Sequence, residues 1–155
     1  MKGFFRLLIG VLFTFALTGC FGEDYDVGVP TAHLSLESKP SVKLTEGNIS
    51  WSSSSGDVNQ RIGDVQKFGL SQDKIKISPG EQVFLDFQEN EENGGDIWTD
   101  PTLKAVLLNG KQRIELKMDD HRELKFPSNK GSYILAVEFV SSRGTAQYVG
   151  NISIQ

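Results

Sequence analysis

Apolar side chains recur at every second position in many segments of this chain between Leu34 and Ile154. Because successive side chains of a β-strand point to opposite faces, this period predicts strands with one buried face. The alternating apolar positions are Leu34 and Leu36; Val42 and Leu44; Ile75 and Ile77; Val83, Leu85 and Phe87; Ile114, Leu116 and Met118; Leu124 and Phe126; Tyr133, Leu135, Val137 and Phe139; and Tyr148, Ile152 and Ile154. A denser apolar run from Leu103 to Leu108 predicts a central strand. Helical period is confined to one turn expected at Asp64 to Leu70, so the pattern predicts an all-β fold.

Turn signals separate the predicted strands; they lie at Ser78-Pro79-Gly80, Asn109-Gly110, 128–131 and Arg143-Gly144. Asn109-Gly110 predicts a type I′ hairpin turn, because both residue types tolerate positive φ. About eight or nine short strands joined in this way predict a β-sandwich or a β-barrel, and we favour an antiparallel, immunoglobulin-like sandwich. The segment from Gly131 to Gln155 resembles the last hairpin of immunoglobulin-like sandwiches, through its glycine turn, its Gly-x-Tyr start and its closing alternating strand. The cysteine pair of antibody domains is absent.

The N-terminus has the parts of an export signal. Residues 1–6 carry two positive charges, and residues 7–17 are almost entirely apolar. That run is shorter than the roughly 20 residues that cross a bilayer core. Leu17-Thr18-Gly19-Cys20 then resembles the lipobox of bacterial lipoproteins. The resemblance implies that diacylglycerol is attached to the Cys20 thiol and that the peptide is cut just before it. An ordinary signal peptide with a chance cysteine is the alternative.

This interpretation divides the chain into three parts. Residues 1–19 are the removable signal, residues 20–31 are the lipidated cysteine with a flexible acidic tether, and residues 32–155 are the sandwich domain. The expected location is the extracytoplasmic face of the cell membrane, where two acyl chains hold a protein stably. Phe21, rather than aspartate, follows the cysteine. In a Gram-negative cell the lipoprotein resemblance then implies the outer membrane.

Charge and composition exclude several classes of function. The formal net charge is −4, and removal of Lys2 and Arg6 with the signal makes the remainder two charges more negative. An acidic chain binds phosphate backbones poorly, so nucleic acid is not an expected partner. One cysteine and two histidines provide neither a disulfide framework nor a Cys/His zinc site.

Two long segments lack alternation, namely Ser50 to Asp73 and Gln88 to Pro101. Long loops in compact domains often carry function, although solvated connections are the favoured interpretation here. Aromatic residues flank both segments, so the candidate binding surface consists of the two tryptophans and an acidic rim: Trp51, Trp98, Glu91, Glu92 and Asp96. The acidic loop could also bind calcium, because oxygen ligands and glycines occur together there. It does not fit the EF-hand pattern, so we expect no metal ligand set and no cofactor.

The sequence contains no catalytic motif. His33 and His121 are the only imidazoles, and His121 follows Asp119-Asp120 in what is expected to be a charged hairpin tip. A nucleophile elbow and a Ser-x-x-Lys motif are both absent. We therefore assign no catalytic residue.

Three functions are consistent with these observations. The favoured one is a non-enzymatic binding or interaction module at the bacterial cell envelope, with a protein, a peptide or a wall polymer as its partner. The second is an envelope hydrolase that uses carboxylates. The third is a structural subunit of an envelope complex, which would present an apolar patch such as Ile134, Ala136 and Val140 unless these residues are the second buried face of a central strand. The oligomeric state cannot be derived from the sequence.

Overall fold

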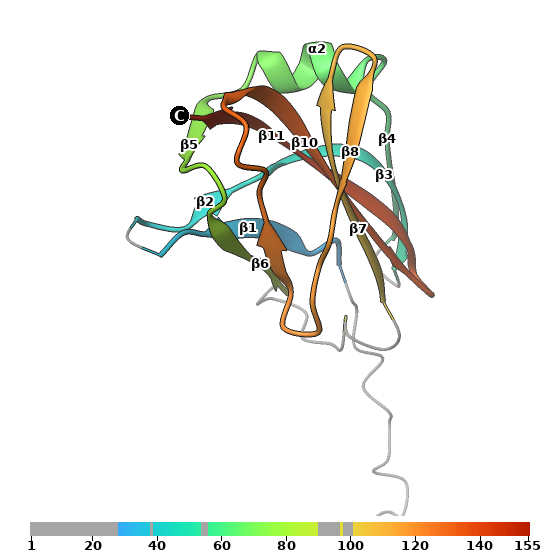
Figure 1. Cartoon of the computed structure of the whole chain (residues 1–155). Helices are drawn as coiled ribbons and strands as arrows, with labels where there is room; N and C mark the ends of the chain where they lie inside the picture. Colours follow the sequence, from blue (N-terminus) through green and yellow to red (C-terminus); the bar gives the residue numbers. More distant parts are fainter. Residues whose placement is uncertain (1–27, 38, 54–55, 90–96, 98–100) are drawn as a thin grey trace, which may run out of the picture.

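The computed structural model describes residues 28–37, 39–53, 56–89, 97 and 101–155. These residues form eleven strands and one short helix (Figure 1). The elements are β1 (Thr31–Ser35), β2 (Val42–Lys43), β3 (Thr45–Ser53), β4 (Gly56–Gln60), α2 (Val65–Leu70), β5 (Lys74–Ile77), β6 (Gln82–Gln88), β7 (Thr102–Asn109), β8 (Gln112–Leu116), β9 (Glu123–Lys125), β10 (Gly131–Ser141) and β11 (Gly144–Ile154). None of the described helices is long and apolar enough to span a membrane.

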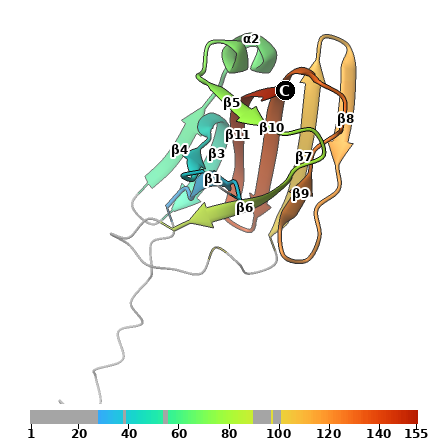
Figure 2. The same cartoon turned by 60° about the vertical axis from the view of Figure 1, so that its left-hand side comes forward.

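The strands form two sheets. The small sheet has the order β2-β1-β6-β9, and the large sheet has the order β4-β3-β11-β10-β7-β8. Neighbouring strands on these two paths are antiparallel, which confirms the predicted antiparallel sandwich. The β10–β11 hairpin is the longest pairing and runs from Gly131 opposite Ile154 to Ser141 opposite Gly144. Figure 2 shows the small sheet lying across the large one, so that their facing sides enclose the core.

Strand β5 joins the large sheet in a way that the alternation did not predict. It pairs with β11 in parallel, with Ile75 opposite Ile152 and Ile77 opposite Ile154. Ile75, Ile77, Ile152 and Ile154 are all buried, because they occupy the inward face of the two strands. Lys74 and Lys76 alternate with them and are exposed.

The core contains nearly all the alternating apolar positions named above. Leu34, Leu85, Leu124, Leu135 and Phe139 are each 0% exposed. Ring contacts connect the two sheets, since the Phe87 ring of β6 lies 4.9 Å from Phe139 of β10 and 5.7 Å from Tyr148 of β11. Burial of these faces is the main stabilising contribution that the pattern encodes.

Helix α2 packs against β10 and β11 on the other side of the large sheet. Asp64 caps it by accepting hydrogen bonds from the backbone amides of Gln66 and Lys67 at 2.9 and 3.1 Å. Helix α2 approaches β10 closely at Gly69: a methyl group added there would lie 2.5 Å from a side-chain atom of Ile134. Ile134 and Ala136 are only 3% and 4% exposed, so they belong to a second buried face rather than to an open patch, whereas Val140 is 38% exposed.

Two local predictions are wrong. The segment from Ser50 to Asp73 is not one loop: it contains the end of β3, all of β4 and helix α2. Strand β4 is an edge strand that is exposed at every residue, and its sequence shows no alternation because neither of its faces is buried. The β7–β8 turn places Gly110 and Lys111 at its centre, since Asn109 pairs with Gln112. Gly110 has φ of 58°, and Asn109 belongs to the strand.

Candidate binding groove

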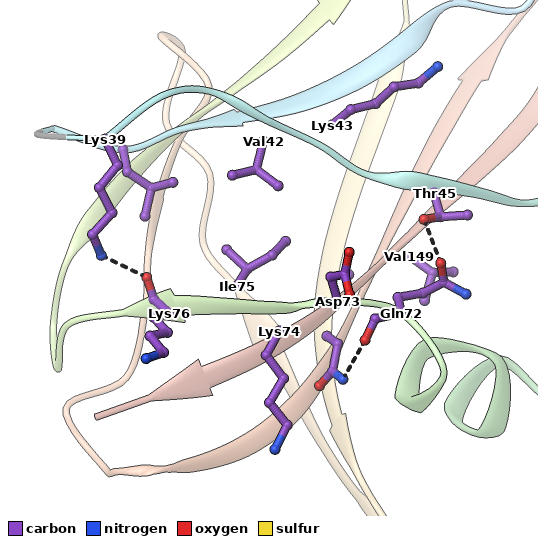
Figure 3. Close-up of a pocket in the computed structure, with 13 residues that line it drawn as sticks. Lys39, Val42, Lys43, Thr45, Gln72, Asp73, Lys74, Ile75, Lys76 and Val149 are labelled. Atoms are coloured by element: carbon purple, nitrogen blue, oxygen red, sulfur yellow. Dashed lines mark hydrogen bonds between the residues drawn. The ribbon is translucent and has the colours of Figure 1, made fainter.

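A groove of about 360 Å³ lies between β5 and the segment that carries β2 (Figure 3). We call it the lysine groove because Lys39, Lys43, Lys74 and Lys76 all line it, against a single carboxylate, Asp73. Its volume falls within the range of small-ligand sites, which begins at about 300 Å³. The excess of positive charge stands out in a chain whose formal net charge is −4.

The groove exists because the edges of the two sheets come together at this corner of the sandwich. β2 is the last strand of the small sheet, and β5 pairs only with β11 among the described strands. The chain passes from the small to the large sheet between β2 and β3, at Leu44. The Leu44 amide donates a 2.8 Å hydrogen bond to the Ala32 carbonyl, which holds this crossing in place.

Hydrogen bonds bridge both ends of the groove. At one end, the Lys39 Nζ donates to the backbone carbonyl of Lys76 at 3.0 Å. At the other end, the Thr45 hydroxyl donates to Gln72 Oε1, also at 3.0 Å. Figure 3 shows both contacts, with Ile75 pointing from β5 into the gap towards Val42. The groove is therefore a defined gap with apolar residues at its floor.

Asn151 fixes the start of β5. This side chain is 2% exposed, and its amide donates to the Gln72 carbonyl at 3.0 Å and to the Leu70 carbonyl at 3.5 Å. A buried amide is costly unless it is hydrogen-bonded, so these contacts hold the turn between α2 and β5 in one conformation. Asn151 is a positioning residue for the groove.

Sequence reasoning missed this site. The four lysines come from two segments of the chain, 39–43 and 74–76, and each segment alone resembles the polar face of a strand. The alternation Lys74-Ile75-Lys76-Ile77 did predict which residues would be exposed. Only the pairing of β5 with β11 brings both segments to one groove.

The surface predicted from the two tryptophans needs a correction. Trp51 is 2% exposed, and its ring centroid lies 6.1 Å from that of Phe139 in the core. Trp51 shares the buried face of β3 with Ile49, so its indole does not contribute to a binding surface. The other four candidates for this surface lie outside the described residues, as does Cys20; they are Glu91, Glu92, Asp96 and Trp98. Within that loop, Ile97 is 3% exposed and its amide donates to Glu89 Oε1 at 3.3 Å.

The two histidines lie in different places. His33 is in β1, where its Nε2 lies 3.1 Å from the Thr31 hydroxyl. His121 is in the exposed turn between β8 and β9, where its amide donates to Asp119 Oδ1 at 2.9 Å. The described residues contain no group of three or more His, Cys, Asp or Glu side chains that could hold a metal ion. The proposed calcium loop lies in the undescribed segment 90–96.

Comparisons of this chain with protein-family models, curated protein sequences and solved structures find no match.

Proposed function

We propose that this protein is a lipid-anchored binding module of the bacterial cell envelope, and that the lysine groove is its recognition surface for an anionic partner. The single observation that carries the choice of surface is the gathering of four lysines and one carboxylate around a bounded groove. The anchor rests on the lipobox resemblance at Leu17-Thr18-Gly19-Cys20.

The charge distribution supports selective binding. Figure 3 shows Lys39 reaching across the groove and the side chains of Lys43 and Lys74 extending outward from its two sides. The lysines therefore raise the positive potential at the rim of the groove, while the acidic remainder of the chain repels anions elsewhere. Lys39, Lys43, Lys74 and Lys76 are all exposed, and among them Lys39 donates to the Lys76 carbonyl. The apolar floor adds contact area that a purely ionic patch lacks.

The location of the groove also supports this function. The tether enters the domain at Thr31, the first residue of β1, whereas Leu36, just beyond the other end of β1, lines the groove. A five-residue strand spans about 16 Å at roughly 3.3 Å per residue. The Leu36 end of the groove is thus separated from Thr31, the first residue of β1, by the length of that strand.

One experiment tests the anchor. Cells that express the full chain are labelled with radioactive palmitate, beside cells that express Cys20→Ala. We expect label in the first protein and none in the second. Equal labelling of both would contradict lipidation at Cys20.

A second experiment tests the groove. The tagged full chain, a Lys74→Glu/Lys76→Glu variant and a Lys111→Glu/Lys130→Glu control are crosslinked in intact producing cells. The control makes the same charge change at exposed positions outside the groove. We expect a dominant crosslinked partner that the groove variant loses and the control retains. Equal capture by the two variants, both with the melting temperature of the parent, would exclude the groove as the recognition surface.

A further inference from the structure

We propose that the partner of the lysine groove is an acidic peptide segment in extended conformation, which adds as a strand to the open edge of β5. This inference rests on the proposed function and names the class of its ligand. Its aliphatic side chains would face the groove floor, and its carboxylates would lie beside Lys74 and Lys76.

The backbone of β5 presents an edge that can accept a strand. The Gln155 amide donates to the Ile77 carbonyl at 3.1 Å, so the backbone groups of Ile77 face β11. Backbone groups of a strand alternate between its two edges, and therefore those of Lys74 and Lys76 face the groove. The contact of Lys39 with the Lys76 carbonyl confirms this direction for Lys76. Peptides commonly bind by completing such an edge.

Lys39 protects this edge in the absence of a partner. Its ammonium group covers the Lys76 carbonyl at 3.0 Å, and lysines at sheet edges discourage pairing with unselected strands. A carboxylate on an incoming strand offers the ammonium group a charged acceptor in place of the neutral carbonyl. The exchange uncovers the carbonyl for a backbone donor of the peptide. The contact between Lys39 and the Lys76 carbonyl therefore disfavours the addition of neutral strands and favours the addition of acidic ones.

Alternation along β5 determines the preferred sequence pattern. Ile75 points inward and Lys74 and Lys76 point outward, so an added strand has the same two faces. Side chains on its inner face meet Ile75, Val42 and Leu36, and those on its outer face lie across from the lysines. A segment that alternates aliphatic and acidic residues matches both faces. With four residues in β5, the pairing extends for about 13 Å.

A wall polymer rich in phosphate would use the lysines but not the backbone edge. The test therefore uses three probes with the full chain purified in detergent. They are the hexapeptide acetyl-Glu-Val-Glu-Val-Glu-Val-amide, the same peptide methylated on every central backbone nitrogen, and inorganic polyphosphate. Binding is measured by titration calorimetry, and amide hydrogen exchange is followed at Lys74 and Lys76.

We expect the unmodified peptide to bind, to slow exchange at both amides, and to lose at least about tenfold in affinity on methylation or in the Lys74→Glu/Lys76→Glu protein. Lys39→Met should reduce the preference for this peptide over the neutral acetyl-Thr-Val-Thr-Val-Thr-Val-amide. Equal affinity for the methylated peptide, or tight polyphosphate binding without exchange protection, would overturn strand addition. If groove-dependent capture in cells persisted in that case, the proposed function would stand. If neither the peptide binding nor the groove-dependent capture in cells were observed, the proposed function itself would be overturned.

Discussion

The phenolic oxygen of Tyr148 donates a 2.5 Å hydrogen bond to the backbone carbonyl of Pro30, which lies 118 residues earlier in the chain. Tyr148 is 0% exposed in β11, and Pro30 is the buried residue that precedes β1. The bond fixes the start of β1 to the central hairpin of the large sheet. Burial, with the nearby negative charge of Glu46 as a second cause, raises the pKa of the Tyr148 hydroxyl above its ordinary value of 10.0.

Tyr148→Phe should lower the free energy of unfolding by about 1–2 kcal/mol, because the buried Pro30 carbonyl loses its donor. The matched control is Tyr133→Phe in β10, where no hydrogen bond of the hydroxyl occurs among the described residues; we expect a change below about 0.5 kcal/mol there. Urea unfolding of the three proteins measures both values. Equal losses in the two variants would show that the hydroxyl contact does not stabilise the domain.

The raised pKa of Tyr148 makes stability decrease at high pH. The folded state holds the phenolic proton after the unfolded chain has begun to release it, so the unfolded state binds fewer protons above pH 10. The contribution of this group is complete below pH 10 and falls by about 1.4 kcal/mol per pH unit above it, until the folded-state pKa is reached. The difference in unfolding free energy between the parent and Tyr148→Phe, measured from pH 8 to 11, isolates this effect. If this difference in unfolding free energy did not change with pH, the raised pKa of Tyr148 would be contradicted.

Gly144→Ala should be among the most destabilising single-methyl changes in the chain. Gly144 has φ of 142°, and an added Cβ would lie 2.0 Å from the Ser50 carbonyl oxygen of β3. We expect a loss of at least about 2 kcal/mol from backbone strain, with displacement of β3 from β11. Gly63→Ala is the control, because its added Cβ would meet nothing within 4 Å. Thermal unfolding should separate the two variants clearly; similar melting temperatures would mean that β3 moves aside without cost.

Removal of the helix cap should cost about 1 kcal/mol. Asp64→Ala deletes the oxygen that accepts from the Gln66 and Lys67 amides at the start of α2. Asp120→Ala removes the same charge from an exposed turn and should change stability by less than about 0.5 kcal/mol. Chemical denaturation gives both values. No difference between the two substitutions would indicate that water replaces the cap fully.

Trp51→Phe should destabilise the domain without changing recognition. The smaller ring leaves space beside Phe139 in the core, and large-to-small core changes typically cost about 1–3 kcal/mol. Crosslinked capture per folded molecule should equal that of the parent protein, because Trp51 is buried in the core and does not line the groove. If Trp51→Phe lost capture without losing stability, Trp51 would have to contribute to partner binding.

Local patterns in the sequence were sufficient to predict the fold class. Alternation placed Leu34, Leu85, Leu135 and Phe139 in the core, and turn signals separated the strands, because side-chain direction along a strand depends only on neighbouring residues. Strand β4 was not predicted, because alternation arises only in a strand that buries one of its faces. Every residue of β4 is exposed, so its sequence has no alternating apolar positions.

The groove depended on tertiary structure alone. Which strand lies beside β11 is decided by contacts between segments far apart in the chain, and alternation is the same whether β5 pairs in parallel, in antiparallel or not at all. Likewise, a tryptophan in a strand faces the core or the solvent according to register, and Trp51 faces the core. The sequence by itself determined which residues of each strand are apolar. The packing of two sheets decided that Lys39, Lys43, Lys74 and Lys76 meet at one edge, because a groove between strands is a property of their pairing.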